Sequence, residues 1–345
     1  MKTGLIILMG LLVGFSGYSQ KNNYKNTMII PHLNEKIESC NIIYCSTYRA
    51  SWTKLRNDII REDVRTVKPM SIVGNLNNNL YKVKNSKEYM VFSGFVKDRI
   101  INEINSSIKN NFGNLQTSLN DYKKVKEGII CFSCYKKEIV FPHKFNSLSY
   151  EFKSGEKQAK VDCFGIINSN NNELCQQVEV FDYKNKDDFV VRIKSDNQNE
   201  EIVLAKVELC GTLSKTVEQT NARINNNVPV LMGKTDKLIV PKINFDIHHM
   251  YNQLKDKYLA NEGFEEFYFL EAIQNIQFSM NESGAFASSS VELVLNQKGP
   301  QPKELVFNEP FLLMIKNAQT NEYDLVVWIN DLELLKRSKN TTSFE

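Results

Sequence analysis

Apolar residues along this 345-residue chain recur at helical intervals in a few segments and at every second position in many more. Between Asp98 and Gly113, four isoleucines recur at helical spacing, which predicts an amphipathic helix that ends at the glycine. These isoleucines are Ile100, Ile101, Ile104 and Ile108. The same periodicity predicts helices at residues 51–63, 212–224 and 248–259. Thr212 or Ser214 is a suitable N-cap for the second of these.

Segments with a period of two predict strands, and they outnumber the predicted helices. They lie at residues 127–141, 148–152, 160–167, 177–184, 187–195, 237–247, 272–282, 311–317 and 324–331. Pro241 places its strand near a sheet edge or a bend, because proline lacks the N–H that a central strand donates. Helices mixed with mainly antiparallel strands predict an α+β fold. No long linker divides the chain, so we expect a single domain over residues 20–345.

The first nineteen residues have the composition of a secretory signal peptide. Lys2 gives a positive start, and residues 4–15 form an apolar core too short to span a bilayer comfortably. Small residues follow, and we expect cleavage between Ser19 and Gln20. The mature chain is therefore expected to be secreted or periplasmic, with no membrane partner. The alternative interpretation is that the same segment remains as a membrane anchor.

Charge and cysteine content narrow the possible partners. The formal net charge is +3, and basic and acidic residues alternate without a basic stripe, so we expect no nucleic acid partner. The seven cysteines are an odd number, so at least one has no partner within the chain. Cys131 and Cys134 have the spacing of a redox pair. However, they lie in a predicted strand, not at the start of a helix that would lower a thiol pKa, so we interpret them as structural.

Groups suited to catalysis or metal binding are few. His248 and His249 are adjacent, which points their rings in different directions, and no HExxH motif completes a metal site. We expect them at the surface where a strand meets a helix. No nucleophile elbow, phosphate loop or dinucleotide fingerprint is present, and the acidic pairs at residues 187–188 and 265–266 fit solvated loops. We therefore expect no enzyme, no metal and no cofactor.

One stretch near the C-terminus combines the characters of a strand and a loop. It reads NESGAFASSSVELVLNQKGPQPKELVFNEPF, from Asn281 to Phe311. One face of its first half carries only small or apolar residues, namely Ala285, Ala287, Ser289, Val291, Leu293 and Leu295. The stretch follows Gly284 and ends in the sequence Gly-Pro-Gln-Pro, which is typical of an exposed loop. This pattern indicates a loop that is able to become a strand.

From about Pro241 to Leu335 the chain resembles the C-terminal part of a serpin, a protease inhibitor that traps its target by inserting a cleaved loop into its main sheet. VPKINFDIHHMYNQL resembles the family's proline-bearing strand and short helix, and FNEPFLLMIKNAQTNEYDLVVWIND resembles its closing strands. IQNIQFSMNESGAFAS resembles the strand that leads into the hinge. The residues on the hinge pattern are Glu282, Gly284, Ala285 and Ala287.

The resemblance implies a large, mostly antiparallel central sheet, further sheets, surrounding helices and an exposed reactive loop at about residues 282–306. In the family, a protease attacks this loop, and the freed segment enters the sheet as a new strand. Ala285 and Ala287 are small, as the start of such an insertion requires. The residues expected to face inward after them are Ser289, Val291, Leu293 and Leu295.

The resemblance also implies a partner. The spacing from Glu282 to Pro310 matches a full-length reactive loop and places the reactive bond between Lys298 and Gly299. A lysine at this bond suits a trypsin-like serine protease with an acidic pocket, and a cysteine protease is the second option. We expect the inhibitor to be a monomer.

Several positions depart from the family pattern. Asn41 matches the family's sheet-control asparagine, but the serines and proline expected after it are absent. The family has a histidine in the strand before the hinge, where this chain has Gln274. It also has a glycine near its C-terminal end, where this chain has Asn330. The long helix with which the family begins must be short or missing in this chain. Phe286 lies at a position where the family commonly has an acidic residue. These departures support an alternative hypothesis, a non-inhibitory serpin-fold secreted protein that binds another protein or a small ligand.

Overall fold

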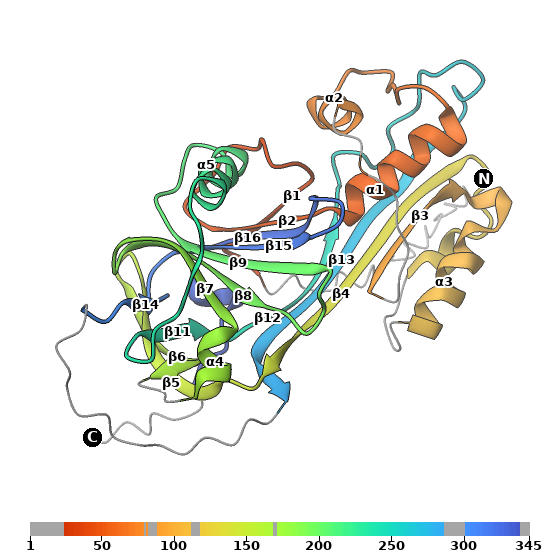
Figure 1. Cartoon of the computed structure of the whole chain (residues 1–345). Coiled ribbons are helices and arrows are strands. Elements are labelled where there is room, and N and C mark those ends of the chain that lie inside the picture. Colours follow the sequence, from red (N-terminus) through yellow and green to blue (C-terminus); the bar gives the residue numbers. More distant parts are fainter. Residues whose placement is uncertain are drawn as a thin grey trace, which may run out of the picture.

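A computed structural model describes residues 24–78, 81, 88–111, 118–167, 171–285 and 301–338. Three sheets dominate the described part of the chain, one of eight strands and two of four strands. Figure 1 shows the longest strands running diagonally through the molecule, with the eight-stranded sheet crossing them near its centre.

The sheet that carries the longest strands is called the long sheet here. Its order is β12 (Ile243–Met250), β13 (Tyr268–Ala285), β4 (Gly128–His143) and β3 (Tyr89–Phe95). The two outer pairs, β12–β13 and β4–β3, are antiparallel, whereas the central pair of β13 and β4 is parallel. The long sheet is therefore antiparallel except at its middle.

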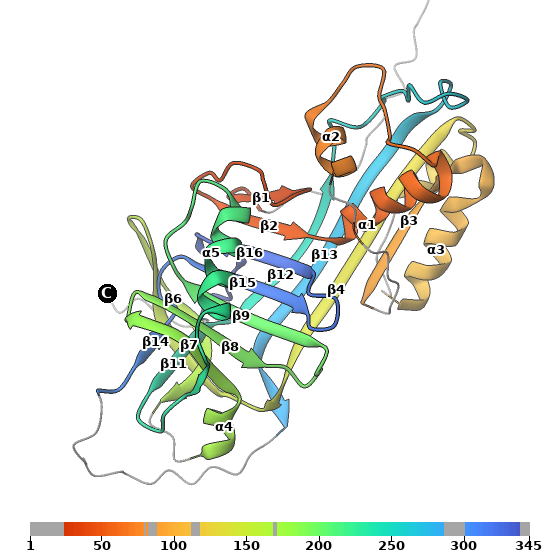
Figure 2. The same cartoon turned by 45° about the horizontal axis from the view of Figure 1, so that its top comes forward.

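The other two sheets form the opposite part of the molecule in Figure 2. The eight-stranded sheet has the order β1 (Thr27–Ile30), β2 (Asn41–Cys45), β16 (Tyr323–Ile329), β15 (Phe311–Asn317), β9 (Glu200–Lys206), β8 (Asp188–Lys194), β7 (Val178–Asn185) and β10 (Val230–Leu231). The third sheet has the order β14 (Glu304–Val306), β11 (Lys237–Pro241), β6 (Lys157–Ile167) and β5 (Asn146–Ser154). A core cluster with residues from all three sheets joins them.

Helices cover the sheets. They are α1 (Thr47–Lys54), α2 (Ser71–Asn78), α3 (Ile100–Asn111), α4 (Asn172–Gln176) and α5 (Leu213–Asn225), with a π-helix at Leu55–Ile60 and 3₁₀ turns at Val96–Asp98, Ser118–Tyr122 and Leu332–Leu334. α1 packs on one face of the long sheet, where Trp52 stacks on Phe269 with ring centroids 5.6 Å apart. α3 packs its buried isoleucines on the other face, against Phe132.

Three of the four predicted helices are confirmed. The segment predicted at residues 51–63 is helical from Thr47 to Ile60, and the isoleucine-rich segment forms α3. The third forms α5, whose N-cap is Thr212, because its side chain accepts a hydrogen bond from the Lys215 amide. The alternating segments form the strands predicted for them, and Pro241 lies at the bend between β11 and β12, which belong to different sheets.

The helix predicted at residues 248–259 is wrong. β12 continues through both adjacent histidines to Met250, which pairs with Ile273 of β13, and turns follow it. The side chain of Tyr251 is buried against Tyr48, with ring centroids 3.9 Å apart. Pairing with a long neighbouring strand therefore decides the conformation of this segment, although its apolar spacing also suits a helix.

All seven cysteines lie in the described residues, and none of them forms a disulfide bond there. Cys131 and Cys134 occupy strand β4, as predicted, and they belong to core clusters on opposite faces of the long sheet. Burial raises the pKa of each of these two thiols to about 12. A thiol of this kind is protonated at neutral pH and is a poor nucleophile, which fits the structural interpretation.

Candidate functional site: the hinge end of the long sheet

The predicted hinge lies at the C-terminal end of β13. Glu282, Gly284 and Ala285 are the last residues of this strand, directly before the predicted loop. The remaining predicted site residues lie outside the described residues; they are Ala287, Ser289, Val291, Leu293, Leu295, Lys298 and Gly299. The described part of the site is therefore the end of β13 and its neighbours, and the chain continues on the far side of the loop at β14.

β13 lies directly beside β4 over almost its whole length. The parallel register begins at Tyr268 beside Gly128 and ends at Ala285 beside His143, with irregularities near each end. No other strand separates the two. The end of β13 is thus held as a strand up to the point where the predicted loop begins.

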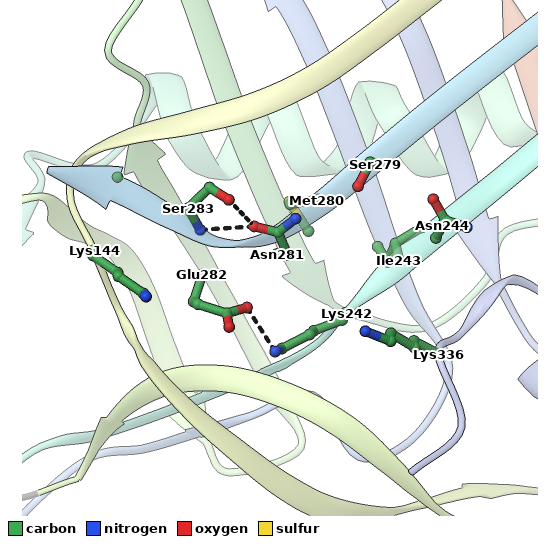
Figure 3. A pocket seen from close by; sticks show the side chains of 11 residues that line it. Lys144, Lys242, Ile243, Asn244, Ser279, Met280, Asn281, Glu282, Ser283 and Lys336 are labelled. Carbon is green, nitrogen blue, oxygen red and sulfur yellow. Dashed lines mark hydrogen bonds and ion pairs between the residues drawn. The ribbon is translucent and has the colours of Figure 1, made fainter. Parts of the chain in front are cut away.

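Glu282 is fixed by an ion pair with Lys242. The Glu282 carboxylate lies 2.6 Å from Lys242 Nζ, as Figure 3 shows, and only 9% of the Lys242 side chain is exposed. Lys242 Nζ also donates a hydrogen bond to Ser147 Oγ at 2.9 Å. Burial of the Glu282 carboxyl opposes its ionisation, but the hydrogen bond from Lys242, a backbone hydrogen bond and the charges of Lys242 and Lys144 together outweigh burial and lower the pKa of Glu282. Lys242 lies at the bend between β11 and β12, so this pair ties the hinge to the neighbouring sheet.

Gly284 is packed too closely against β4 to carry a side chain. A Cβ atom at this position would lie 2.6 Å from the carbonyl oxygen of Phe141 and 2.8 Å from the amide nitrogen of Lys144. Both neighbours are backbone atoms, which cannot rotate away. The glycine of the predicted hinge pattern therefore allows β13 to lie against the end of β4.

A pocket of about 520 Å³ opens beside the hinge. Figure 3 shows Glu282 facing Lys242 across it, with Lys144 and Lys336 on its other sides. Asn281 stabilises the turn of the backbone here, since its Oδ1 atom accepts a hydrogen bond from the Ser283 amide at 2.7 Å. None of the residues that line the pocket belongs to a helix of the described chain.

A second residue from the sequence comparison, Gln274, lies at the middle of the long sheet. Gln274 is fully buried on β13, and its Nε2 atom donates to the Cys45 carbonyl at 2.9 Å and to Thr47 Oγ1 at 2.8 Å. The hydroxyl of Tyr251 donates to Gln274 Oε1 at 2.7 Å. Through these three bonds the side chain of Gln274 joins β13 to the start of α1 and to the end of β12.

The structure also brings together Asn41 and Asn330, which the sequence does not predict to be neighbours. The Oδ1 atom of Asn41 accepts hydrogen bonds from the amides of Asn330 and Asp331, each at 2.8 Å. These bonds join the start of β2 to the end of β16. They lie in the eight-stranded sheet, and Gln274 is connected to them along β2, which ends at Cys45.

Comparison with known proteins decides the fold. No protein-family model matches the chain. Among solved structures, a tumour-suppressing serpin matches 84% of this chain and 92% of its own with a TM-score of 0.57 at 10% identity. Serine protease inhibitor (serpin)-12 of Manduca sexta matches 86% of this chain and 94% of its own with a TM-score of 0.54, also at 10% identity. The chain has the serpin fold.

The serpin fold confirms the predicted α+β class, with several sheets and surrounding helices. Native protease nexin-1, solved with heparin, also shares it, with a TM-score of 0.50, 11% identity and coverage of 84% of this chain and 92% of its own. β13 of this serpin fold spans the sequence that resembles the family's strand before the hinge. No helix among the described residues is both long enough and apolar enough to cross a bilayer.

Three important residues of the site were missed from the sequence. Lys242 had no distinguishing pattern, because its partner lies 40 positions away. Tyr251 was assigned to a helix that does not form, and Thr47 stands at a position for which the family pattern specifies no residue. Each of them acts through a contact that only the folded sheet creates.

Proposed function

We propose that this protein is a serpin-type inhibitor that traps a serine protease through cleavage of its reactive loop. The observation that carries this proposal is the parallel pair of β13 and β4 inside an otherwise antiparallel sheet. A segment that folded back from the end of β13 and entered between these strands would run antiparallel to both. The long sheet would then be antiparallel throughout, which is the slightly more stable pairing per residue.

The length of the predicted inserting segment supports the same mechanism. Residues 285–297 number 13, and a strand of this length extends for roughly 44 Å at about 3.4 Å per residue. β4 has 16 residues, so its length is about 54 Å on the same scale. The segment would fill most of the space between the parted strands. Its alternate small and apolar residues would face the core that already holds Ile276 and Phe278 of β13.

The proposed chemistry begins at the bond between Lys298 and Gly299. The nucleophilic serine of the protease attacks the Lys298 carbonyl carbon, the Gly299 amine leaves with a proton, and an acyl-enzyme forms. Insertion of the freed segment carries the acylated protease away from its docking position before water hydrolyses the ester. Release of the strain held in the intact protein drives the insertion.

The contacts at the hinge set how the long sheet opens. Ala285 and Ala287 would enter first, at the end where Glu282 pairs with Lys242 and where Gly284 lies against β4. Small side chains are needed there because the strands part at that end first. Farther from the hinge along β13, the inserting segment would pass Gln274, whose side chain donates a hydrogen bond to the Cys45 carbonyl.

The proposal includes export of the chain and a particular class of target. Residues 1–19 would be removed as a signal peptide, and residues 20–345 would act as one domain with its reactive loop at about 282–306. Lys298 would occupy the acidic specificity pocket of a trypsin-like protease. A cysteine protease remains the second class to test.

The deciding experiment is incubation of the purified mature protein with trypsin, followed by denaturing gel electrophoresis. We expect a covalent complex that resists denaturation, and we expect none with trypsin whose catalytic serine has been blocked. Lys298→Ala should abolish the complex with trypsin. Cleavage of the loop without a complex would contradict inhibition and would favour the alternative function, a non-inhibitory serpin-fold binding protein.

A further inference from the structure

A basic pocket of about 500 Å³ lies at the end of the long sheet opposite the hinge. It is lined by Val96, Lys97, Arg99, Ile101, Asn102, Lys123, Lys124 and Lys126. These residues lie just after β3, which ends at Phe95 beside Ile129, and just before β4, which begins at Gly128. The hinge lies at the other end of β4, about 50 Å away for a strand of 16 residues. The pocket is therefore separate from the inhibitory site.

Five of the eight lining residues are cationic, and none is acidic. In the described part of the chain, none of these five side chains forms an ion pair; they are Lys97, Arg99, Lys123, Lys124 and Lys126. Some other cations of this protein each pair with two carboxylates. Arg192 lies between Glu179 and Glu201, and Lys206 pairs with both Asp187 and Glu309. The basic pocket thus gathers five positive charges that no carboxylate among the described residues pairs with.

The backbone holds one of these cations in an unfavourable conformation. Arg99 has φ 67° and lies in the left-handed region, which is unfavourable for a residue with a β-carbon. It joins the 3₁₀ turn at Val96–Asp98 to α3, and its carbonyl accepts a hydrogen bond from the Asn102 amide at 2.9 Å. A glycine would fit this position with less strain. An arginine at such a position is unfavourable for folding and therefore suggests a use for its side chain.

The floor of the pocket is apolar and fixed. Val96 and Ile101 line it and are only 5% and 2% exposed, because both belong to the core cluster beneath α3. Lys97 lies over the rings of Phe95 and Phe267, with Nζ 5.0 Å and 4.8 Å from their centroids. The cations therefore surround a bounded space with a rigid base and do not form an extended stripe along the surface.

We propose that the basic pocket binds a compact polyanion that carries two or more phosphate or sulfate groups. Lysine and arginine donate charge-assisted hydrogen bonds to such oxygens, and arginine can contact one group with two parallel bonds. A ligand with one charge would leave most of the five cations unneutralised, whereas a ligand with several charges would neutralise the cluster as a whole. This proposal does not depend on protease inhibition.

The test is titration of the intact mature protein with inorganic tripolyphosphate, followed by calorimetry at low and high salt. We expect binding that weakens at least tenfold between about 50 mM and 500 mM NaCl, since salt screens exposed charges. A triple variant, Lys123→Ala with Lys124→Ala and Lys126→Ala, should bind at least tenfold more weakly. The matched control replaces three exposed lysines elsewhere by alanine, at Lys68, Lys160 and Lys215, and should change affinity less than twofold.

A second variant separates binding from folding. Arg99→Gly removes one cation and relieves the left-handed strain, so the unliganded protein should melt at the same or a higher temperature while tripolyphosphate binds at least threefold more weakly. A trisulfated disaccharide as a second probe distinguishes phosphate from sulfate as the preferred group. No binding of either probe at low salt, or an equal loss of affinity in the Lys68, Lys160 and Lys215 control, would overturn the proposal.

Discussion

At the scale of single residues, the hinge is held by one ion pair and one glycine. Lys242 lies at the bend between β11 and β12, Glu282 lies on β13, and each is largely withdrawn from solvent. Gly284 brings β13 so close to β4 that any side chain would meet backbone atoms. Together the two contacts fix the position of β13 at the end where the proposed insertion begins. The intact protein would therefore be kept closed by contacts that a small number of substitutions can remove.

Replacement of Glu282 by glutamine should destabilise the protein at neutral pH but not in acid. Pairing with Lys242 lowers the pKa of Glu282 in the folded state, so its carboxylate stabilises the fold above its ordinary pKa of 4.5. This stabilisation is lost as the pH falls through the lowered pKa of the folded protein. We expect Glu282→Gln to reduce the free energy of unfolding by roughly 1–2 kcal/mol at pH 7 and by much less near pH 3. Urea unfolding of both proteins across this range measures the difference, and a constant difference would show that the ion pair does not contribute.

A methyl group at Gly284 should be costly. Gly284→Ala places a carbon 2.6 Å from the Phe141 carbonyl oxygen, and we expect a loss of about 1–3 kcal/mol in unfolding free energy. Gly74→Ala is the matched control, because no atom lies within 4 Å of its added carbon and alanine favours the helix that contains it. Urea unfolding of the two variants should therefore shift in opposite directions. A Gly284→Ala variant as stable as Gly74→Ala would show that β13 can move away from β4 without cost.

At the scale of elements, the middle of β13 is bonded to α1 and β12 through one buried amide. Gln274 is the central residue of this network, and it makes all three of its hydrogen bonds to groups that water does not reach. The position of β13 is therefore fixed by side-chain bonds to α1, to β2 and to the end of β12, as well as by its backbone pairing with β4 and β12. The network is the expected barrier to insertion beyond the hinge.

Gln274→Ala should destabilise the long sheet, because it leaves the buried Tyr251 hydroxyl and the Cys45 carbonyl without this partner. We expect a loss of about 2–3 kcal/mol in unfolding free energy. Gln277→Ala is a control on the same strand, since its amide donates one exposed hydrogen bond to Asp246 and its removal should cost less than about 1 kcal/mol. Native-state hydrogen exchange on β13 should rise in the first variant only. Equal exchange in both would show that the buried amide does not hold the strand.

The sequence predicts the elements of this site better than it predicts their contacts. Alternation of apolar residues marks β13 and β4 correctly, and the small residues after Glu282 mark the hinge. The same kind of pattern misassigns residues 248–259, because a helix and a strand followed by turns both accommodate their apolar spacing. Lys242 and the five cations of the basic pocket could not be found in this way. Their arrangement could not be predicted, because it depends on residues that are distant in sequence and that meet only when the strands pair.

At the scale of the whole molecule, the serpin fold places two distinct regions at opposite ends of one sheet. The hinge lies where β4 ends, and the basic pocket lies where β4 begins. The cores on the two faces of the sheet are separate clusters, so the strands between them are supported from both sides. Opening the sheet for a new strand therefore has to disturb both clusters, which makes the closed and the filled sheets two distinct states of the protein.

Cleavage of the loop should raise the thermal stability of the protein if the freed segment enters the sheet. An added strand that contributes several kcal/mol would raise the melting temperature by roughly 5–15 °C for a chain of this size. Calorimetry before and after limited proteolysis measures the change. Ala285→Arg places a long charged side chain at the start of the segment and should abolish the rise without preventing cleavage. Stabilisation of the Ala285→Arg variant to the same degree would refute the assignment of the hinge.

The thiol of Cys134 gives the closed sheet a built-in reporter. Asn275 of β13 donates to its sulfur at 3.7 Å across the very contact that insertion would break, and the thiol is otherwise enclosed by the core beneath α3. An alkylating reagent cannot reach it while the strands are together, but it gains access when they part. The labelling rate of Cys134, read separately from those of the six other thiols by peptide mapping, would thus measure how often the sheet opens in the unaltered protein.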